Sequence, residues 1–255
     1  MADAWNPVQY ERFKKERAQP FHDLLAGVRP APGGRAVDLG CGTGELTRAL
    51  HARLQAAETV GIDNSAAMLE KAKAHAGGGL RFETGDIARF EGKDLAVVFS
   101  NAALHWVPDH PAYWSRIGSW LAPGGQLAVQ MPSNEDHPSH ACARAVAGQP
   151  PWRERLGGFV RLSPVLAPEQ YAELLAEAGF SEPQVRLQVY VHTLDDRAGV
   201  IEWVKGTLLT DYQAHLTPEQ YEEFLVDYRA ELFRTLPDRR PFLYTYKRIL
   251  LWATR

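Results

Sequence analysis

The sequence predicts an α/β protein with a doubly wound, mostly parallel sheet of seven strands and helices on both faces. Apolar, β-branched runs recur along the chain, and segments of helical periodicity separate them. The runs are almost continuously apolar, as expected of strands that helices cover on both sides. The first run leads directly into the turn GCGTG, where glycines occupy every second position from Gly40 to Gly44.

Seven segments are predicted as strands. The first five follow one another with helix-length spacers, which implies parallel pairing through crossover connections. Two more lie in the C-terminal part of the chain, and the first of these alternates apolar and polar residues. The predicted strands are 35–40, 59–63, 80–86, 95–101, 126–132, 185–194 and 248–254.

Three segments carry clear helix signals. Residues 64–76 and 167–180 have an apolar face and a glycine at or near their ends. Residues 217–236 give the strongest signal, with Thr217 as N-cap and Gln220 at the capping-box position. The apolar face of this last helix consists of Tyr221, Phe224, Leu225, Tyr228, Leu232 and Leu236.

The strand and helix pattern predicts a single domain, 1–255, with helical additions. Residues 31–132 would form the core that carries the glycine turn, and residues 1–30 an N-terminal helical lid. Helical insertions are expected at 133–180 and 195–246. These insertions can lie only over the edges of the sheet or over its carboxyl end, where open α/β sheets bind ligands.

The composition of the chain disfavours several classes of binding partner. A net charge of −3 in 255 residues gives no electrostatic reason to expect nucleic acid or an anionic membrane. Two cysteines are too few for a disulfide framework, the N-terminus has no apolar leader, and no run is long enough to span a bilayer. We therefore expect a cytoplasmic protein whose partner is a small molecule. We also expect a monomer, although the composition does not decide the oligomeric state.

The glycine turn predicts a site for an anionic group. Its glycines bring bare backbone N–H groups close to a ligand, and the N-terminus of the following helix favours negative charge there. Asp38 stands two residues before Gly40 and would repel a pyrophosphate. Together with the spacing G-x-G-x-G in place of G-x-G-x-x-G, this disfavours an NAD-dependent dehydrogenase. A ligand with an ammonium beside a carboxylate would use both features.

Two further acids follow the next two strands. Asp63 ends the second strand about 20 residues further on, where an acid commonly binds ribose hydroxyls. Asp86 and the adjoining Ile87 end the third strand and suit the exocyclic amine and the flat face of an adenine. An amino acid, a ribose and an adenine in this order describe S-adenosylmethionine.

The segments VDLGCGTGEL, GIDNS, GDI and NAALHWV resemble the ordered motifs of class I S-adenosylmethionine-dependent methyltransferases. WNPVQYERFKKERAQP, NAALHWVPDHP, GGQLAVQMPSNEDHPSH and IEWVKGTLL narrow the resemblance to the trans-aconitate 2-methyltransferases. The similarity covers nearly the whole chain and is weaker across 141–180. It implies the Rossmann-like class I methyltransferase fold with a helical cap. The implied activity is methyl ester formation on a carboxylate of trans-aconitate or a similar small organic acid, with S-adenosyl-L-homocysteine as the second product.

The resemblance and the motifs together indicate the site residues. Cofactor contacts are expected at Tyr10, Asp38, Gly40, Cys41, Gly42, Asp63, Asn64, Met68, Gly85, Asp86, Ile87, Asn101, Ala102 and His105. Acceptor contacts are expected at Arg17, His105, Trp106, Asn134 and Trp203, and by chain region also at His137, His140, Arg153 and Lys205. No general base is required, because a carboxylate with a pKa of about 4 is already ionised at neutral pH. No metal is expected, because HPSH lacks partner ligands in a known pattern.

Two alternatives keep the same cofactor. One is an O- or N-methyltransferase of a different small molecule, and the other is a non-catalytic S-adenosylmethionine-binding protein. A base-methylating enzyme is disfavoured, because NAAL stands where such enzymes usually carry an Asn-Pro-Pro-aromatic motif.

Overall fold

The computed structural model describes residues 14–255, with side chains from Ala18 onward. The chain divides into two compact units. The first, called the sheet unit here, consists of Ala18–Ser133, Pro164–Gln188 and Lys247–Arg255. The second, the helical unit, includes Asn134–Ser163 and Val189–Tyr246.

Seven strands form one sheet, as predicted, and their order is β3-β2-β1-β4-β5-β7-β6. The pairs from β3 through β5 are parallel, and β7 runs antiparallel to β5. The third strand ends two residues earlier than predicted, and the last three begin earlier. The strands are β1 (Arg35–Leu39), β2 (Glu58–Asp63), β3 (Leu80–Thr84), β4 (Leu95–Asn101), β5 (Leu121–Pro132), β6 (Ser181–Leu194) and β7 (Phe242–Thr254).

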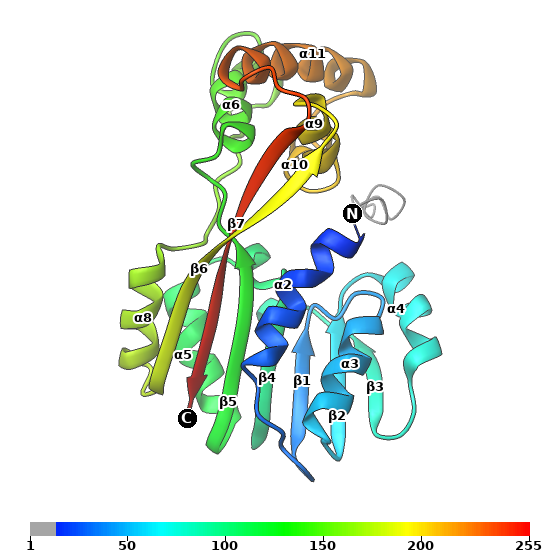
Figure 1. Ribbon diagram of the computed structural model, residues 1–255, viewed down its shortest axis with the longest axis vertical. Helices are drawn as coiled ribbons and strands as arrows, with labels where there is room; N and C mark the ends of the chain where they lie inside the picture. The colour runs from blue at the N-terminus through cyan, green and yellow to red at the C-terminus, as the bar shows by residue number, and fades with distance from the viewer. Residues whose placement is uncertain (1–13) are drawn as a thin grey trace. The chain divides into compact units, whose positions relative to one another are not determined.

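Helices cover both faces of the sheet unit (Figure 1). On one face, α2 (Lys14–Ala26) and α3 (Glu45–Leu54) pack Phe21 and Leu50 against the sheet. On the other face, α5 (His110–Trp120) and α8 (Pro168–Glu177) do the same. The remaining elements are α4 (Ala66–Ala72), α6 (Pro138–Ala147), α7 (Trp152–Arg155), α9 (Ala198–Lys205), α10 (Leu208–Gln213), α11 (Pro218–Thr235) and the 3₁₀ turns η1 (Lys73–His75), η2 (Ile87–Arg89) and η3 (Leu104–Trp106).

Strand β1 pairs with both β2 and β4, so the chain reverses its direction across the sheet between β3 and β4. The loops that leave the carboxyl ends of β1 and β4 therefore continue on opposite sides of the sheet. A crevice between such loops is the usual ligand site of an open α/β sheet.

The helical unit has a core of its own, to which α11 contributes its predicted apolar face. Thr217 Oγ1 accepts the Gln220 N–H at 3.3 Å, and Gln220 Oε1 accepts the Thr217 N–H at 3.1 Å. This reciprocal pair is the predicted capping box. The buried residues of α11 are Tyr221, Phe224, Tyr228 and Leu232.

The division into units differs from the predicted ranges at two places. Helix α8 belongs to the sheet unit, where Tyr171 and Leu175 are fully buried in the core shared with α5. The first helical insertion thus ends before Pro164, although 133–180 was predicted. Within the predicted lid, 1–30, Phe21 and Leu24 are buried in the core of the sheet unit.

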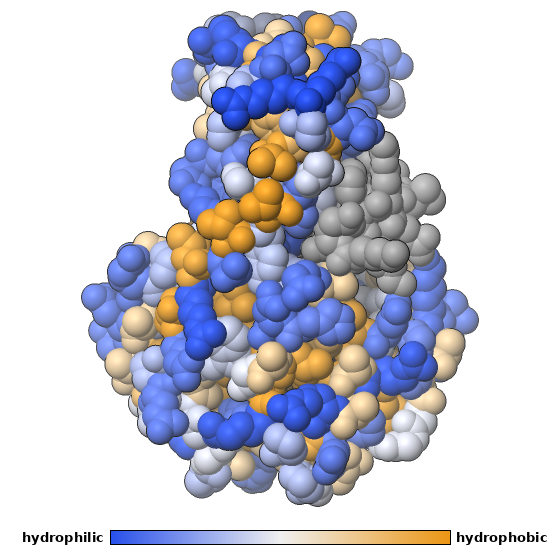
Figure 2. All heavy atoms as spheres, in the orientation of Figure 1, coloured by the Kyte–Doolittle hydropathy of each residue, from blue (hydrophilic) through white to orange (hydrophobic). Residues whose placement is uncertain are grey.

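Hydrophilic side chains predominate on the face seen in Figure 2, with apolar patches between them. Strand β6 keeps large apolar side chains exposed on alternate residues, namely Leu187, Val189 and Val191. Among the helices that the structure describes, none combines the length and the apolar character needed to cross a membrane.

Candidate active site

The turn after β1 holds three glycines in the left-handed region. Their φ angles are +82° at Gly40, +54° at Gly42 and +75° at Gly44. A Cβ on Gly40 would lie 2.1 Å from the Cβ of Ala103, so this residue lets the turn pack against the loop that follows β4. A Cβ on Gly42 would meet nothing within 4 Å. The turn is therefore closed on one side by β4 and open at its middle glycine.

Asp63, at the end of β2, accepts hydrogen bonds from the backbone of this turn and of the next one. Its Oδ2 accepts the backbone N–H of Gly42 at 2.9 Å, and its Oδ1 accepts that of Ser65 at 2.9 Å. One half-buried carboxylate thus ties the turn after β1 to the start of α4. Each carboxylate oxygen has a further lone pair, so the predicted ribose contact stays compatible with these bonds.

Asp38 is buried beneath the turn. Thr47, on α3, donates its hydroxyl to Asp38 Oδ2 at 2.6 Å, and both side chains are inaccessible to solvent. Burial raises the pKa of Asp38 to about 7; the Thr47 bond opposes this rise, and the charge of Asp63 adds to it. Sequence reasoning missed Thr47, although its position one helical turn beyond the glycines was a signal.

Cys41 is a packing residue of the same turn. Its side chain is buried, and burial raises the pKa of its thiol, so the thiolate is disfavoured at neutral pH. A Cβ on Gly61 would lie 2.8 Å from the Cβ of Cys41, which shows how closely the turn approaches β2. These contacts indicate a packing residue and not a nucleophile.

The end of β4 lies next to the end of β1 at the same edge of the sheet. Asn101 Oδ1 is buried, and among the described residues it has no hydrogen-bond partner. Ala102 has a φ of +55°, a left-handed conformation that costs a non-glycine residue free energy and recurs at functional sites. An unsatisfied buried oxygen beside a strained residue indicates that a ligand group completes this end of the sheet.

The predicted cofactor residues after β2 and β3 also lie at the carboxyl edge. Asn64 is exposed and Met68 is buried on α4. After Gly85, Asp86 Oδ1 accepts the Ala88 N–H at 2.9 Å and so caps η2, which begins at Ile87. The side chain of Asp86 is about half exposed, at 53%. The adenine contact of Asp86 and Ile87 stays a prediction.

The predicted acceptor residues belong to both units. His105 and Trp106 lie on η3 of the sheet unit with their rings 4.7 Å apart, and Trp106 is 46% exposed. Asn134 and Trp203 are buried in the helical unit, where Trp203 stacks on His192 at 4.4 Å. Tyr10 and the side chain of Arg17 lie outside the part of the chain that the structure describes.

The remaining polar candidates, all in the helical unit, have local roles. His137 caps α6, since its Nδ1 accepts the Ser139 N–H at 3.1 Å. His140 is buried, which lowers its pKa to about 3 and keeps the ring neutral. Arg153 is exposed, and Lys205 pairs with Glu202 at 2.9 Å. The described residues contain no group of three side chains suited to bind a metal ion.

Besides the bond between Asp38 and Thr47, a second hydrogen bond between buried polar side chains was not predicted. Arg248 on β7 donates from Nη1 to Gln130 Oε1 on β5 at 3.2 Å, and both side chains are buried. Two polar residues inside the apolar runs QLAVQMP and KRILLWAT were the available signal. That they meet could not be read from the sequence, because they lie 118 residues apart.

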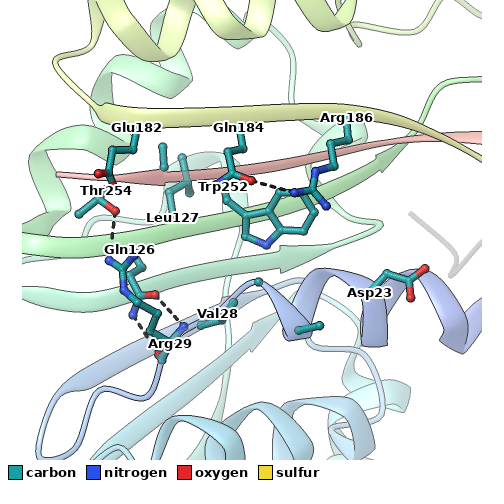
Figure 3. Close-up of a pocket in the computed structure, with 13 residues that line it drawn as sticks. Asp23, Val28, Arg29, Gln126, Leu127, Glu182, Gln184, Arg186, Trp252 and Thr254 are labelled. Atoms are coloured by element: carbon teal, nitrogen blue, oxygen red, sulfur yellow. Dashed lines mark hydrogen bonds between the residues drawn. The ribbon is translucent and has the colours of Figure 1, made fainter.

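A pocket of about 310 Å³ lies at the other end of the same strands (Figure 3). Gln126 and Thr254 pair there across β5 and β7, whereas Pro132 and Arg248 pair at the carboxyl end of β5. Trp252 lines this pocket, and the guanidinium carbon of Arg186 lies 5.1 Å from the centre of the Trp252 ring. None of the predicted site residues lines this pocket.

The sequence and the fold of this chain are similar to those of known proteins. A family model described as a methyltransferase domain matches residues 36–125, which include the glycine turn and the ends of β2 and β4. Trans-aconitate 2-methyltransferase of Deinococcus radiodurans is 44% identical over 257 residues and covers 98% of both chains. The protein of the same name from Variovorax paradoxus is 41% identical and covers 92% of this chain and 91% of its own. The crystal structure of the YcgJ protein of Bacillus subtilis has a TM-score of 0.60 at 15% identity, covers 92% and 97% of the two chains, and supports the fold alone.

Proposed function

Because this chain belongs to the trans-aconitate 2-methyltransferase family of class I S-adenosylmethionine-dependent methyltransferases, we propose that it forms a methyl ester on a carboxylate of trans-aconitate or a closely similar acid. The observation that carries this proposal is the likeness to relatives of that name over nearly the full length of the chain. The predicted cofactor motifs all lie at the carboxyl edge of one sheet, which supports the same conclusion.

The residues at this edge fit S-adenosylmethionine. The open space beside Gly42 suits the amino-acid part of the cofactor, and the buried Asn101 Oδ1 is an acceptor for its ammonium. Asp38 lies buried beneath the turn, and Asp63 can accept from the ribose hydroxyls. The bound sulfonium would supply the methyl group, whose bond to sulfur breaks as the acceptor oxygen bonds to the carbon.

The chain's own task is to align the acceptor and to exclude water. A carboxylate acceptor is ionised at neutral pH, so no side chain has to remove a proton. Alignment of two bound reactants can supply on the order of 7–11 kcal/mol. The charge of the carboxylate is lost as the ester forms, so removing water from it favours the reaction. His105, at the same edge of the sheet, is the side chain that we assign to acceptor contact.

The test is transfer of a labelled methyl group from S-adenosylmethionine to a panel of acids. Trans-aconitate, cis-aconitate, citrate and a saturated tricarboxylate are the acceptors, and a neutral alcohol and an amine are the controls. We expect label in a base-labile methyl ester of trans-aconitate, with one S-adenosylhomocysteine released per ester. Label in the alcohol or amine alone would support a different small-molecule acceptor. Cofactor binding without transfer to any compound would support a non-catalytic protein.

A further inference from the structure

Three polar side chains form a row across neighbouring strands at the carboxyl edge of the sheet unit. Asn101 on β4 is the register partner of Gln130 on β5. On β7, Arg248 is the partner of Pro132, two residues beyond Gln130 on the same strand. Register partners, and residues two apart on one strand, point to the same face of a sheet. The three side chains therefore share one face, which begins at β4 beside the glycine turn and leads to β7.

Gln130 and Arg248 hold each other in one orientation. Gln130 is fully buried and Arg248 is 7% exposed, and the guanidinium donates to the amide oxygen at 3.2 Å. Because that oxygen faces Arg248, the amide nitrogen points elsewhere, and among the described residues Gln130 Nε2 has no hydrogen-bond partner. A buried donor without a partner destabilises the folded protein, which indicates that a ligand acceptor completes it.

On the basis of the function proposed above, we propose that Arg248, oriented by Gln130, binds a carboxylate of the acceptor other than the one that is methylated. A guanidinium presents several N–H donors in a planar fork that matches a carboxylate. Gln130 occupies part of that fork and offers its free N–H group beside it. A polycarboxylate can accept hydrogen bonds from both side chains, whereas a monocarboxylate must present its single charge to the cofactor.

One carboxylate of the acceptor loses its charge during the reaction, and this indicates which carboxylate should bind Arg248. The methylated carboxylate becomes a neutral ester, so a bond from Arg248 to it would weaken in the transition state and slow the reaction. A carboxylate that does not react keeps its charge throughout. Arg248 bound to that group would contribute equally to substrate and transition state, and its removal should raise KM while kcat changes little.

The variants Arg248→Gln and Arg248→Lys test this assignment. Arg186→Gln is the matched control, because Arg186 is an exposed arginine of the neighbouring strand β6 and lines the pocket at the other end of the sheet. For each protein we would measure kcat and KM for trans-aconitate, the affinity for S-adenosylhomocysteine, and the melting temperature. Calorimetric titration of trans-aconitate into the protein saturated with S-adenosylhomocysteine gives acceptor affinity without turnover.

We expect Arg248→Gln to raise KM and the calorimetric Kd for trans-aconitate by about 30- to 100-fold, as for a lost charged hydrogen bond. Arg248→Lys should lose about 10-fold, since it keeps the charge without the fork. Arg186→Gln should match the wild type, and S-adenosylhomocysteine affinity should stay constant in all variants. If Arg248→Gln does not fold, the lysine variant provides the same comparison.

Unchanged acceptor affinity in the folded Arg248 variants would overturn this assignment while leaving the proposed function intact. Equal losses of acceptor and S-adenosylhomocysteine affinity would also overturn it, because they would indicate a structural role. A wild-type protein that methylates none of the acids would refute the proposed function itself.

Discussion

The substitution Gly42→Ala, with its control, distinguishes two effects of an added Cβ at the glycine turn. One effect is on ligand binding, and the other is on backbone strain. Gly42 has a φ of +54°, and an added Cβ would meet nothing within 4 Å. In the folded state, the left-handed conformation costs an alanine about 1–2 kcal/mol. Replacing glycine also lowers the conformational entropy of the unfolded chain, and this offsets about 0.4–1 kcal/mol of that cost. We therefore expect a net loss of about 1 kcal/mol in the free energy of unfolding without ligand.

Gly33→Ala is the matched control. Gly33 has a φ of +73° and also meets nothing within 4 Å, but it lies before β1, away from the carboxyl edge. Urea denaturation should give similar free energies of unfolding for the two variants. Calorimetry should give a loss in S-adenosylmethionine affinity of about 10-fold or more for Gly42→Ala alone, equivalent to about 1.4 kcal/mol. Equal affinities in both variants would refute the reasoning that the open side of Gly42 faces the cofactor.

Three further predictions concern the same edge. Gly40→Ala should destabilise the protein by about 2–4 kcal/mol in urea denaturation, because its Cβ would lie 2.1 Å from that of Ala103; a loss as small as that of Gly33→Ala would contradict this packing. Asp63→Ala should weaken S-adenosylmethionine binding about 10- to 100-fold by calorimetry, more than Asp86→Ala, and equal effects would contradict the central role of Asp63. The raised pKa of Asp38, about 7 in the folded protein against 3.8 as its ordinary value, means that the folded state binds more protons between these pH values. Stability should therefore fall by about 2–3 kcal/mol from about pH 5 to about pH 8, and Asp38→Asn should remove this part of the slope; identical slopes in the two proteins would contradict it.

Local patterns in the sequence were enough to predict the sheet and several of the residues that lie at its carboxyl edge. Continuous apolar runs give the strands, and because parallel strands end at one edge, Asp38, Asp63 and Asn101 could be placed together without a structure. The capping box at Thr217 likewise depends on residues three apart. These predictions succeeded because each depends on neighbours in the chain or on the common direction of the strands.

The features that were missed depend on contacts between distant segments. Helix α8 is part of the sheet unit because Tyr171 packs against α5, and no local pattern carries that information. The Asp38–Thr47 bond requires the exact turn of the chain between β1 and α3. The Gln130–Arg248 pair depends on the register of β5 against the antiparallel β7. In each case the contact depends on which side chains are buried together or on the register of two strands.

The crystal structure of this protein with S-adenosylhomocysteine tests the assignment of the cofactor edge most directly. We predict the amino-acid carboxylate over the backbone at Gly42, the ammonium near Asn101 and the ribose hydroxyls on Asp63. A nucleoside bound away from these three residues, with the turn after β1 left empty, would contradict the account.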